Sequence, residues 1–416
     1  MDVEIITIGD ELLIGQVVDT NSAWMGQALN EEGFRVIRRT SVGDVEEEII
    51  SAIEAARSRA PVLLLTGGLG PTRDDLTLQA LCRYFGCRLH FSEAVYADME
   101  RFFRLRGRPV NELTRLQAMV PDRCTVIRNQ AGTAPCTWFE REGLTLVSMP
   151  GVPSEMQWLM RNEVLPRLAK QFRRDLYIRH QTSWVRNYTE SELAMHLSGF
   201  ENGLPPFVKL AYLPQPGVMC LRLSATGPQA GLIDETMTAL QADLEGLLGG
   251  DLFATGDKPV EMIVGERLRA RGCTVGTAES CTGGAIAALL TSAPGSSGYF
   301  VGSIVAYANA VKRQVLGVAE EDLRQRGAVS REVVEQMAQG ALCVLGCDYA
   351  IATSGIAGPE GGTPDKPVGS VWIAVASKHG VASRYYRFGA LRAQNVQRAG
   401  LTALLMLLEQ MEQEVS

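Results

Sequence analysis

The sequence predicts an α/β protein built from three domains, and two observations support this fold class. Apolar segments of strand length alternate with helical segments through most of the chain, which is typical of mainly parallel sheets covered by helices. The length of 416 residues exceeds what one hydrophobic core usually organises. Changes in composition near 170–175 and 249–259 place the predicted domains at 1–172, 173–254 and 255–416.

The first domain is expected to contain a parallel sheet whose loops carry the chemistry. Its strands are predicted at 3–8, 34–40, 62–66 and 144–149. Its helices are predicted at 21–32, 45–59 and 76–84, from there to about 119, and at 153–170. In this architecture ligands bind beyond the carboxyl ends of the strands.

The other two domains show shorter α/β patterns. In the second, strands are predicted at 177–186, 207–213 and 218–226, and helices at 190–198 and 229–248. The stretch 249–259 is rich in turn residues and is interpreted as a linker. In the third, a strand at 273–278 leads into a helix from 284, a second strand ends near Tyr307, and the last helix spans 394–414.

Charge and hydropathy narrow the classes of function. The net charge of −7 and the pI of about 5.4 argue against broad binding to nucleic acid or to anionic membranes. A group of arginines at 101–108 is interpreted as a solvated helix face. Apolar stretches stay below the ~18 residues of a membrane span, and the acidic N-terminus runs into a strand, unlike a signal peptide. We therefore expect a cytoplasmic protein without a membrane segment.

Cysteine and histidine usage constrains the chemistry further. The nine cysteines are odd in number and show no C-x-x-C spacing. They are interpreted as buried thiols in a reducing compartment, not as disulfides or a zinc site. With only four histidines, the chain is expected to work largely without imidazole.

The most informative segment places two potential nucleophiles on a strand-to-helix turn. An apolar strand precedes Ser280 and Cys281, and a glycine pair at 283–284 opens the next helix. Unpaired N–H groups at a helix start stabilise an anion or a nucleophile. Ser280 and a Cys281 thiolate both fit this position, although Cys281 also fits as a small buried hydrophobic residue. The amides of Thr282, Gly283 and Gly284 are candidates for binding an oxyanion.

A serine nucleophile needs a base, and histidine is scarce here. His379 is the single histidine of the third predicted domain. It is expected at a hairpin tip, away from the turn. Lys312, at the start of the helix after the strand that ends near Tyr307, is the candidate base, because burial lowers the pKa of a lysine. Tyr307 is a candidate relay or hydrogen-bond donor. The alternatives are a surface lysine and a core aromatic residue.

A loop rich in glycine and proline follows a later strand. Its span, 354–367, suits close approach of the backbone to a ligand, or movement as a lid. Gly355 is a candidate ligand contact in this loop. Lys366, and Arg392 further along the chain, are candidates for holding a phosphate.

A second glycine loop lies in the first domain. Gly67 and Gly68 follow a strand and precede a helix, where their amides suit a phosphate. Carboxylates at the same edge of the sheet are candidate ligands of a divalent cation. They are Asp10, Glu11, Asp74 and Asp75. Thr133 and Glu155 belong to a polar rim. The alternative is a glycine turn with an aspartate that caps a helix.

Six segments resemble those of the CinA family of bacterial competence/damage-inducible proteins, and they span essentially the whole chain in one order. The segments are I-I-T-I-G-D-E-L-L-I-G-Q-V-V-D-T-N at 5–21, T-G-G-L-G-P-T-R-D-D-L-T at 66–77, G-T-A-P at 132–135, M-P-G-V-P-S-E-M at 149–156, A-E-S-C-T-G-G at 278–284 and S-G-I-A-G-P-E-G-G-T-P-D-K-P-V-G at 354–369.

The resemblance implies folds and activities. It implies a MoaB/MogA-like three-layer α/β domain acting as a metal-dependent ADP-ribose pyrophosphatase, followed by a small KH-like middle domain. It implies a C-terminal α/β domain that deamidates nicotinamide mononucleotide without a cofactor, usually within a homodimer. The expected metal of the N-terminal domain is Mg, Mn or Co, with K as a further candidate.

The resemblance also implies roles for single residues. Ser280 matches the nucleophile of the family, and Tyr307 and Lys312 match its tyrosine and lysine. Further residues expected to bind substrate are Asn111 and the serine pair Ser296 and Ser297.

Three departures from the family pattern stand out. Phe388-Gly389-Ala390-Leu391-Arg392 keeps the arginine of Phe-x-Gly-Asp-Arg but lacks its aspartate, so an orienting role for that aspartate is in doubt. The usual Gly-Ile-Gly-Glu-Ser of the middle domain reads Arg186-Asn187-Tyr188-Thr189-Glu190-Ser191. Cys136 replaces a glycine beside the expected N-terminal pocket.

Two other functions stay open. The N-terminal domain is alternatively a non-catalytic module that binds a pterin or a nucleotide, since a fold alone does not define a function. The protein is alternatively an accessory factor in DNA uptake or repair, against which its acidic balance argues.

Overall fold

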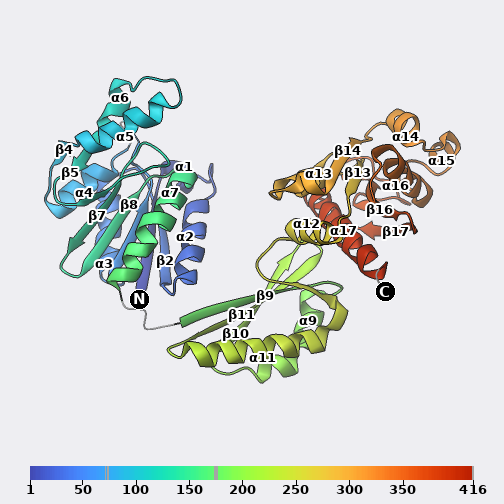
Figure 1. The fold of residues 1–416 in the computed structure, drawn as a ribbon, viewed down its shortest axis with the longest axis horizontal. Helices are drawn as coiled ribbons and strands as arrows, with labels where there is room; N and C mark the ends of the chain where they lie inside the picture. The colour runs from blue at the N-terminus through green and yellow to red at the C-terminus, as the bar shows by residue number, and fades with distance from the viewer. Residues whose placement is uncertain (71, 73–74, 173–176, 415–416) are drawn as a thin grey trace. The chain divides into compact units, whose positions relative to one another are not determined.

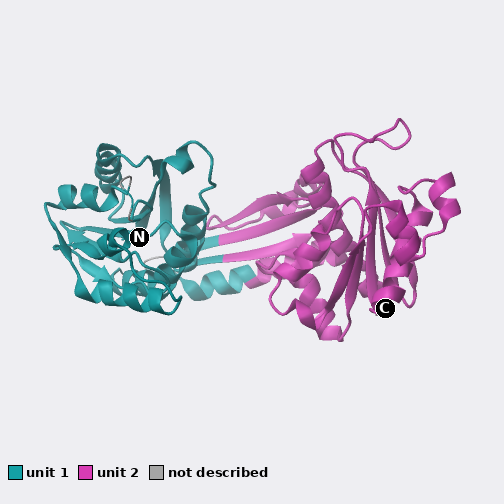
Figure 2. Ribbon diagram, turned by 90° about the horizontal axis from the view of Figure 1, so that it is seen from above, with its two compact units in different colours: residues 1–179, 225–237 teal, residues 180–224, 238–416 magenta. Residues whose placement is uncertain are grey.

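The computed structural model describes residues 1–70, 72, 75–172 and 177–414 (Figure 1). The chain divides into two compact units, which are residues 1–179 with 225–237 and residues 180–224 with 238–416 (Figure 2). Segments of the predicted middle domain fall in both units. The division into three domains therefore stays a prediction.

The first unit is built on a six-stranded sheet. Its strands are β1 (Asp2–Ile8), β2 (Arg35–Val42), β3 (Val62–Thr66), β6 (Thr125–Ile127), β7 (Cys136–Arg141) and β8 (Leu144–Met149). They lie in the order β2-β1-β3-β8-β7-β6. The first four in this order are parallel, and β7 is antiparallel to both of its neighbours. The expected parallel sheet is thus confirmed, with an antiparallel edge.

Helices cover both faces of this sheet. They are α1 (Asp10–Leu13), α2 (Thr20–Glu31), α3 (Glu46–Arg57), α4 (Thr77–Phe85), α5 (Glu93–Arg104), α6 (Glu112–Arg115), α7 (Pro153–Leu159) and α8 (Leu165–Gln171), with a π-helical turn at Met160–Val164 and a 3₁₀ turn at Leu116–Ala118. Ile5 and Leu64 pack with α2, α7 and α8, whereas Ile6 and Leu65 pack with α3 and α4. Successive strand residues face opposite sides, so the apolar runs are buried on both faces. The result is a three-layer α/β arrangement (Figure 1).

One expectation for this region was wrong, and two strands were missed. The helix expected to continue to about residue 119 is interrupted by β4 (Leu89–Phe91), which pairs with β5 (Met119–Pro121). The short strands β6 and β7 were not predicted. With three residues, β6 is too short to show a reliable period.

A four-stranded sheet follows in the order β10-β11-β9-β12. Its strands are β9 (Tyr177–Val185), β10 (Val208–Gln215), β11 (Val218–Gly227) and β12 (Leu252–Thr255), accompanied by α9 (Glu190–His196), α10 (Ser198–Asn202) and α11 (Ala230–Leu248). The linker expected at 249–259 was a wrong prediction. Part of this segment forms a 3₁₀ turn at Gly249–Asp251 and then β12, which pairs antiparallel with β9. β12 contains the apolar residues Leu252 and Phe253, and Phe253 is buried, but the turn residues on either side of the strand led to the linker interpretation.

The second unit also contains a five-stranded sheet with the order β14-β13-β15-β16-β17. The strands are β13 (Val275–Glu279), β14 (Phe300–Val305), β15 (Tyr349–Gly355), β16 (Ser370–Ser377) and β17 (Gly380–Arg387). The first three in the sheet order are parallel, and the last two are antiparallel. His379 lies in the turn between β16 and β17, as predicted.

Helices again pack on both faces of the five-stranded sheet. They are α12 (Val260–Arg271), α13 (Ala285–Ser292), α14 (Asn309–Leu316), α15 (Glu320–Gln325), α16 (Arg331–Leu345) and α17 (Arg392–Gln413). One cluster joins α12, α13 and α17 to Ile351 and Ile373 of the strands. The other joins α16 to Ala350, Ala352 and Ala374, whose small side chains let the helix approach the sheet closely.

Two expectations from composition are tested by the structure. Within the part of the chain that the structure describes, no helix combines the length and apolar content needed to cross a bilayer. All nine cysteines are free thiols. Cys136, Cys220 and Cys281 are buried as expected, but Cys343 is exposed and the others are half-buried, so burial of all the thiols was a wrong expectation.

Candidate functional site

The strand-to-helix turn that carries Ser280 lies at the carboxyl edge of the five-stranded sheet. β13 ends at Glu279, and α13 begins at Ala285. β13 lies between β14 and β15, both parallel to it, and the Ser280 amide donates to the carbonyl of Thr353 on β15 (3.0 Å). The predicted location of Ser280 on a strand-to-helix turn is confirmed.

Lys312 lies next to Ser280. The Lys312 Nζ is 3.1 Å from Ser280 Oγ, and it also donates to the carbonyls of Ala306 (2.8 Å) and Tyr307 (3.1 Å). Lys312 is only 1% exposed, and this burial lowers the pKa of its ammonium group. A lowered pKa favours the neutral amine, and a neutral amine is able to accept the proton of a serine within hydrogen-bond distance.

Cys281 faces the hydrophobic core. Its side chain is 7% exposed and packs in the cluster that joins α12, α13 and α17. Burial raises the pKa of the Cys281 thiol to about 12. Since the thiolate is the nucleophilic form of cysteine, this environment favours the small-hydrophobe interpretation of Cys281 over the rival nucleophile.

Glu279 belongs to the turn that the sequence singled out, but no role was predicted for it. Its fully buried carboxylate accepts hydrogen bonds from the backbone N–H groups of Gly284 (2.9 Å), Ile286 (3.1 Å) and Ala287 (2.9 Å). The side chain therefore occupies the positive end of α13. An acidic residue just before a nucleophile and a glycine pair was the available signal.

The Gly283 and Gly284 amides, predicted to bind an oxyanion, already have hydrogen-bond partners within the turn. The Gly284 amide is bonded to Glu279, and the Gly283 amide donates to the carbonyl of Ser280 (3.1 Å). The two glycine amides serve the turn itself. Thr282 also points inward, because its hydroxyl hydrogen-bonds to the hydroxyl of Thr353 (2.7 Å) and the residue is 4% exposed.

Tyr307 and Arg392 meet at the surface beside the lysine. The backbone carbonyl of Tyr307 contacts Lys312, whereas its phenol is 60% exposed and accepts a hydrogen bond from Arg392 Nη2 (3.3 Å). Arg392 Nη1 also donates to the carbonyl of Gly358 (3.1 Å). The guanidinium is thus held between the Tyr307 side chain and the loop at 354–367, without the missing aspartate.

Other predicted residues lie away from this cluster or serve the fold. Ser296 and Ser297 precede β14, whose first residue pairs with the first residue of β13, so they lie at the opposite edge of the sheet from Ser280. Lys366 Nζ donates to the carbonyl of Arg326 (2.6 Å), so it braces a loop. A Cβ on Gly355 would come within 2.7 Å of the carbonyl oxygen of Ser370, so this glycine permits strand packing.

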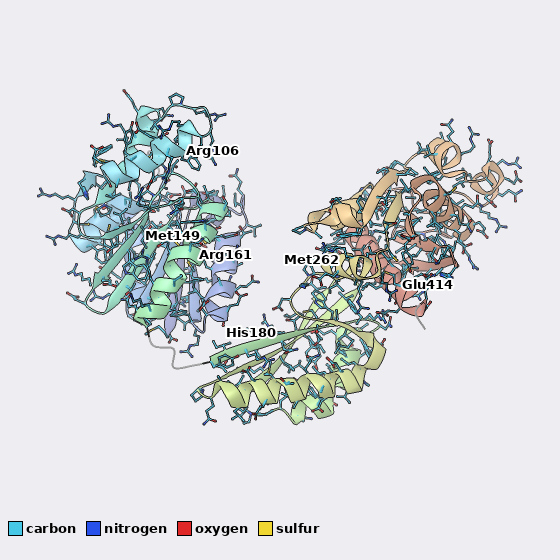
Figure 3. The ribbon with its side chains drawn as sticks, in the orientation of Figure 1. Arg106, Met149, Arg161, His180, Met262 and Glu414 are labelled. Atoms are coloured by element: carbon cyan, nitrogen blue, oxygen red, sulfur yellow. The ribbon has the colours of Figure 1, made fainter. Side chains whose placement is uncertain are left out.

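A cleft of about 370 Å³ lies at the carboxyl edge of the six-stranded sheet. Its walls are the loops that follow β1, β3 and β8 and the start of α2. Met149, labelled in Figure 3, is buried at the end of β8, directly before the part of the wall at 151–153. Gly67 and Gly68 line the cleft with positive φ values of 114° and 62°. A Cβ at these positions would come within 2.0 Å of the carbonyl of Ile8 and 2.2 Å of Thr77 Oγ1, respectively.

Carboxylates gather at this cleft. Asp10 and Asp44 exchange hydrogen bonds between backbone amides and side chains (3.0 and 3.2 Å). Burial raises the pKa of Asp44, and the nearby charges of Asp10, Glu11 and Asp75 raise it further. Asp44 was not predicted, because a lone aspartate after a strand carries no motif. Asp75 lines the cleft, but its carboxylate accepts from the amides of Gly70 (2.7 Å) and Thr72 (2.8 Å), as in the alternative of an aspartate that caps the glycine turn. Asp74 lies outside the described residues.

The cleft also holds a polar group without a partner among the described residues. Asn21 Nδ2 donates to the carbonyl of Gly151 (2.7 Å) and to Thr66 Oγ1 (3.2 Å). Because Gly151 offers only an acceptor, the amide orientation is fixed, and Asn21 Oδ1 is the buried acceptor left over.

The remaining predicted N-terminal residues stabilise local structure. Asn111 caps α6, because its Oδ1 accepts from the Thr114 amide (2.7 Å). Glu155 accepts from Asn129 Nδ2 (2.5 Å) and from the backbone of Thr133 and Ala134, and burial raises its pKa. Glu155 and Thr133 therefore tie the loop at 129–134 to α7. None of these three predicted residues is part of the wall of the cleft.

Comparisons with known proteins show the family to which the chain belongs. The family model described as CinA C-terminal domain matches residues 257–411, and the one described as probable molybdopterin binding domain matches residues 4–170. A CinA-like protein of Flavobacterium psychrophilum is 39% identical over 415 residues, with 99% of this chain and 98% of that protein covered. The chain belongs to the CinA family.

A further relative matches along the whole chain, and a solved structure matches about a third of it. A CinA-like protein of Chloroherpeton thalassium is 40% identical over 414 residues, with 98% of each chain covered. Among solved structures, the competence/damage inducible protein CihA of Agrobacterium tumefaciens is 40% identical, covers 36% of this chain and 96% of its own, and has a TM-score of 0.35.

Proposed function

We propose that the site at Ser280 is an amidohydrolase that converts nicotinamide mononucleotide to nicotinate mononucleotide and ammonia. The observation that carries this proposal is the 3.1 Å contact between Ser280 Oγ and the buried Lys312 Nζ. A serine with a neutral lysine is a sufficient pair for acyl transfer. The substrate itself comes from the family resemblance.

In this mechanism Ser280 and Lys312 act in two steps. Neutral Lys312 accepts the Ser280 proton as Oγ attacks the carboxamide carbon, and the protonated lysine then gives that proton to the leaving nitrogen. The carbon–nitrogen bond breaks, ammonia leaves, and an ester on Ser280 forms. Water activated by Lys312 hydrolyses the ester and restores the serine. The amides of Cys281 and Thr282, next to the nucleophile, are the proposed oxyanion donors.

The phosphate of the mononucleotide is assigned to Arg392. Its guanidinium is exposed and lies beside the Tyr307 phenol, and a guanidinium matches phosphate geometry in a bidentate manner. Tyr307 is assigned a positioning role, because its phenol contacts the arginine. Lys366 is assigned a loop-bracing role in place of phosphate binding.

Ammonia release tests this function. The full chain, free of added metal, should release ammonia from nicotinamide mononucleotide and form nicotinate mononucleotide in equal amounts. Absence of both products would contradict the proposed amidase.

For the N-terminal cleft we propose metal-dependent hydrolysis of ADP-ribose to AMP and ribose 5-phosphate. The glycine amides at 67–68 suit a phosphate. The carboxylates of Asp10, Glu11, Asp44 and Asp75 have the oxygen-donor chemistry that Mg²⁺ or Mn²⁺ prefers, and Co²⁺ is a further candidate, with K⁺ as an accessory ion. A bound divalent ion would neutralise charge that develops on the phosphates.

The donor set fits a cation that shares its ligands with substrate. Within residues 1–70, 72, 75–172 and 177–414, no group of three histidine, cysteine or acidic side chains is spaced to hold a metal by itself. Mg²⁺ is commonly bound by one or two carboxylates together with substrate phosphates. The proposed site follows that pattern, with the carboxylates near Asp44 as the protein ligands.

Product analysis separates the two candidate roles of this cleft. With ADP-ribose and Mg²⁺ or Mn²⁺, the full chain should form AMP and ribose 5-phosphate. Calorimetric binding of ADP-ribose without turnover would contradict the hydrolase and favour a non-catalytic nucleotide-binding module.

A further inference from the structure

The loop between α1 and α2 exposes apolar side chains beside the N-terminal cleft. Ile14 is 75% exposed, Val17 50% and Val18 78%. Contiguous exposed apolar surface that is rimmed by polar residues is a mark of ligand-binding grooves. Val17 and Val18 line the cleft, and so do Leu12 of α1 and Val152 of the loop after β8.

The two valines are held in place by the backbone on both sides. The amides of Gln16 and Val17 donate to the carbonyl of Glu11 (2.9 and 3.2 Å), and the Thr20 amide donates to the carbonyl of Val18 (2.8 Å). Asp19 then caps α2 through the Ser22 amide (2.9 Å). The valine pair is therefore a fixed part of the wall.

The cleft has two chemically different parts. Gly67 and Gly68, with the Asp44 and Asp75 carboxylates, form a part suited to phosphate and cation. The aliphatic part is formed by Leu12, Val17, Val18, Leu69 and Val152. The volume of the whole cleft, about 370 Å³, falls within the ~300–1,000 Å³ of typical small-molecule sites. A sugar phosphate or pyrophosphate alone offers nothing to the aliphatic part, whereas the flat face of a heterocycle does.

We propose that Val17 and Val18 bind the nucleobase of a nucleotide whose phosphates lie at the glycine loop. This inference rests on the proposed function of the cleft and deepens it. The valines select nucleotides over phosphorylated sugars, and they bind the AMP half of the substrate. They are specificity residues and take no part in bond breaking.

Calorimetric titration of the full chain with AMP and with ribose 5-phosphate, in the presence of Mg²⁺, tests the proposal. The wild-type chain should bind AMP at least about tenfold more tightly than ribose 5-phosphate, since removing small apolar contacts costs about 10–200-fold. The double variant Val17→Ser/Val18→Ser should weaken AMP binding by about tenfold or more. Its affinity for ribose 5-phosphate should not change.

A matched control separates this effect from damage to the fold. Val344, which is 54% exposed on α16, is substituted to serine in a region remote in sequence. Val344→Ser should leave both affinities unchanged. Because all three valines are exposed, the melting temperatures of both variants should equal that of the wild type.

Three results would overturn the proposal. The first is that the wild-type chain does not bind AMP. The second is that the double variant binds AMP with unchanged affinity. Equal weakening of both ligands is the third. If sedimentation shows that the double variant loses a dimer while AMP binding is unchanged, a second copy of the chain covers the valines instead. If the wild type binds AMP as expected but forms no products from ADP-ribose, the hydrolase proposal fails and the nucleobase site stands.

Discussion

The partners of the buried Lys312 ammonium group are one hydroxyl and two backbone carbonyls. Neutral oxygens compensate the burial of a charge only in part, which is why burial lowers the lysine pKa. At the scale of single residues, the proposed chemistry depends on this effect. Ser280 supplies the nucleophile, and the environment of Lys312 supplies the base.

The lowered pKa predicts the pH dependence of the amidase. Only the neutral lysine accepts the Ser280 proton, so kcat/KM for nicotinamide mononucleotide should rise with pH through the pKa of Lys312. That rise should lie below 10.5, the ordinary value for a lysine. Rates of ammonia release between about pH 6 and 10 measure it. A rise centred at the ordinary lysine value would contradict the role of burial.

Replacing the lysine tests the base directly. Lys312→Met keeps an unbranched buried side chain but removes the proton acceptor, so kcat should fall by about 10²–10⁴-fold. Lys378→Met, at an exposed lysine between β16 and β17, is the control and should keep the wild-type rate. Comparable losses in both variants would show that the effect of Lys312→Met is not specific to the site.

At the scale of secondary-structure elements, the turn between β13 and α13 depends on Glu279. Its carboxylate binds three N–H groups of the first turn of α13. The N–H groups at the start of α13, which the sequence suggested were unpaired, are therefore hydrogen-bonded to the residue before the nucleophile. This contact fixes the backbone on both sides of Ser280.

Glu279→Gln should destabilise the fold. The amide group would face backbone N–H donors and leave at least one unsatisfied, at a cost of about 1–3 kcal/mol in the free energy of unfolding. Glu320→Gln, which removes an exposed ion pair with Arg313, should cost at most about 1 kcal/mol. Urea unfolding measures both values. Equal stability of the two variants would mean that Glu279 does not hold α13.

Strongly apolar elements were predictable from the sequence. β3 and β8 match their predicted bounds because each is buried on both sides. β12 was missed because its four residues are too few to show a period and lie between runs of turn residues, and its pairing with β9 is visible only in the structure. The same reasoning applies to the site. Ser280 follows from its motif, and Lys312 from its place in the sequence together with the family resemblance. The contacts of Arg392 join segments that are distant in the sequence, and those of Glu279 are local but depend on the path of the turn.

The N-terminal site was less predictable for a physical reason. A glycine loop after a strand indicates where a ligand lies, and Gly67 and Gly68 do line the cleft. Carboxylates in the sequence do not reveal which ones face it. Asp44 faces the cleft without a motif, while Glu155 carries a motif and instead ties down a loop.

At the scale of the whole molecule, the two proposed activities belong to different compact units. Ser280 and Lys312 lie in one, and the glycine loop and Asp75 lie in the other. Each site draws its proposed functional groups from its own unit. The activities are therefore expected to be separable, and the homodimer implied by the family stays a prediction for sedimentation to test.

Metal removal should separate the two activities. A chelator should abolish ADP-ribose hydrolysis and leave ammonia release unchanged, because the proposed cation belongs to the N-terminal cleft and the proposed amidase mechanism uses Ser280 and Lys312. Asp75→Asn should likewise lower ADP-ribose hydrolysis alone. Product formation from both substrates, assayed on the same samples, measures this. Full ADP-ribose hydrolysis after chelation would contradict the metal, and parallel loss of ammonia release would contradict separability.

The central claim is that Ser280 is the nucleophile of the amidase. Its most direct test is the rate of ammonia release from nicotinamide mononucleotide by Ser280→Ala and Cys281→Ala, measured with the wild-type chain under one condition. Ser280→Ala should lose at least about 10³-fold in kcat, since removal of a nucleophile leaves only binding and oxyanion contributions. Cys281→Ala should stay within about tenfold of the wild type, because its buried thiol only fills the core. Normal ammonia release by Ser280→Ala would contradict the account.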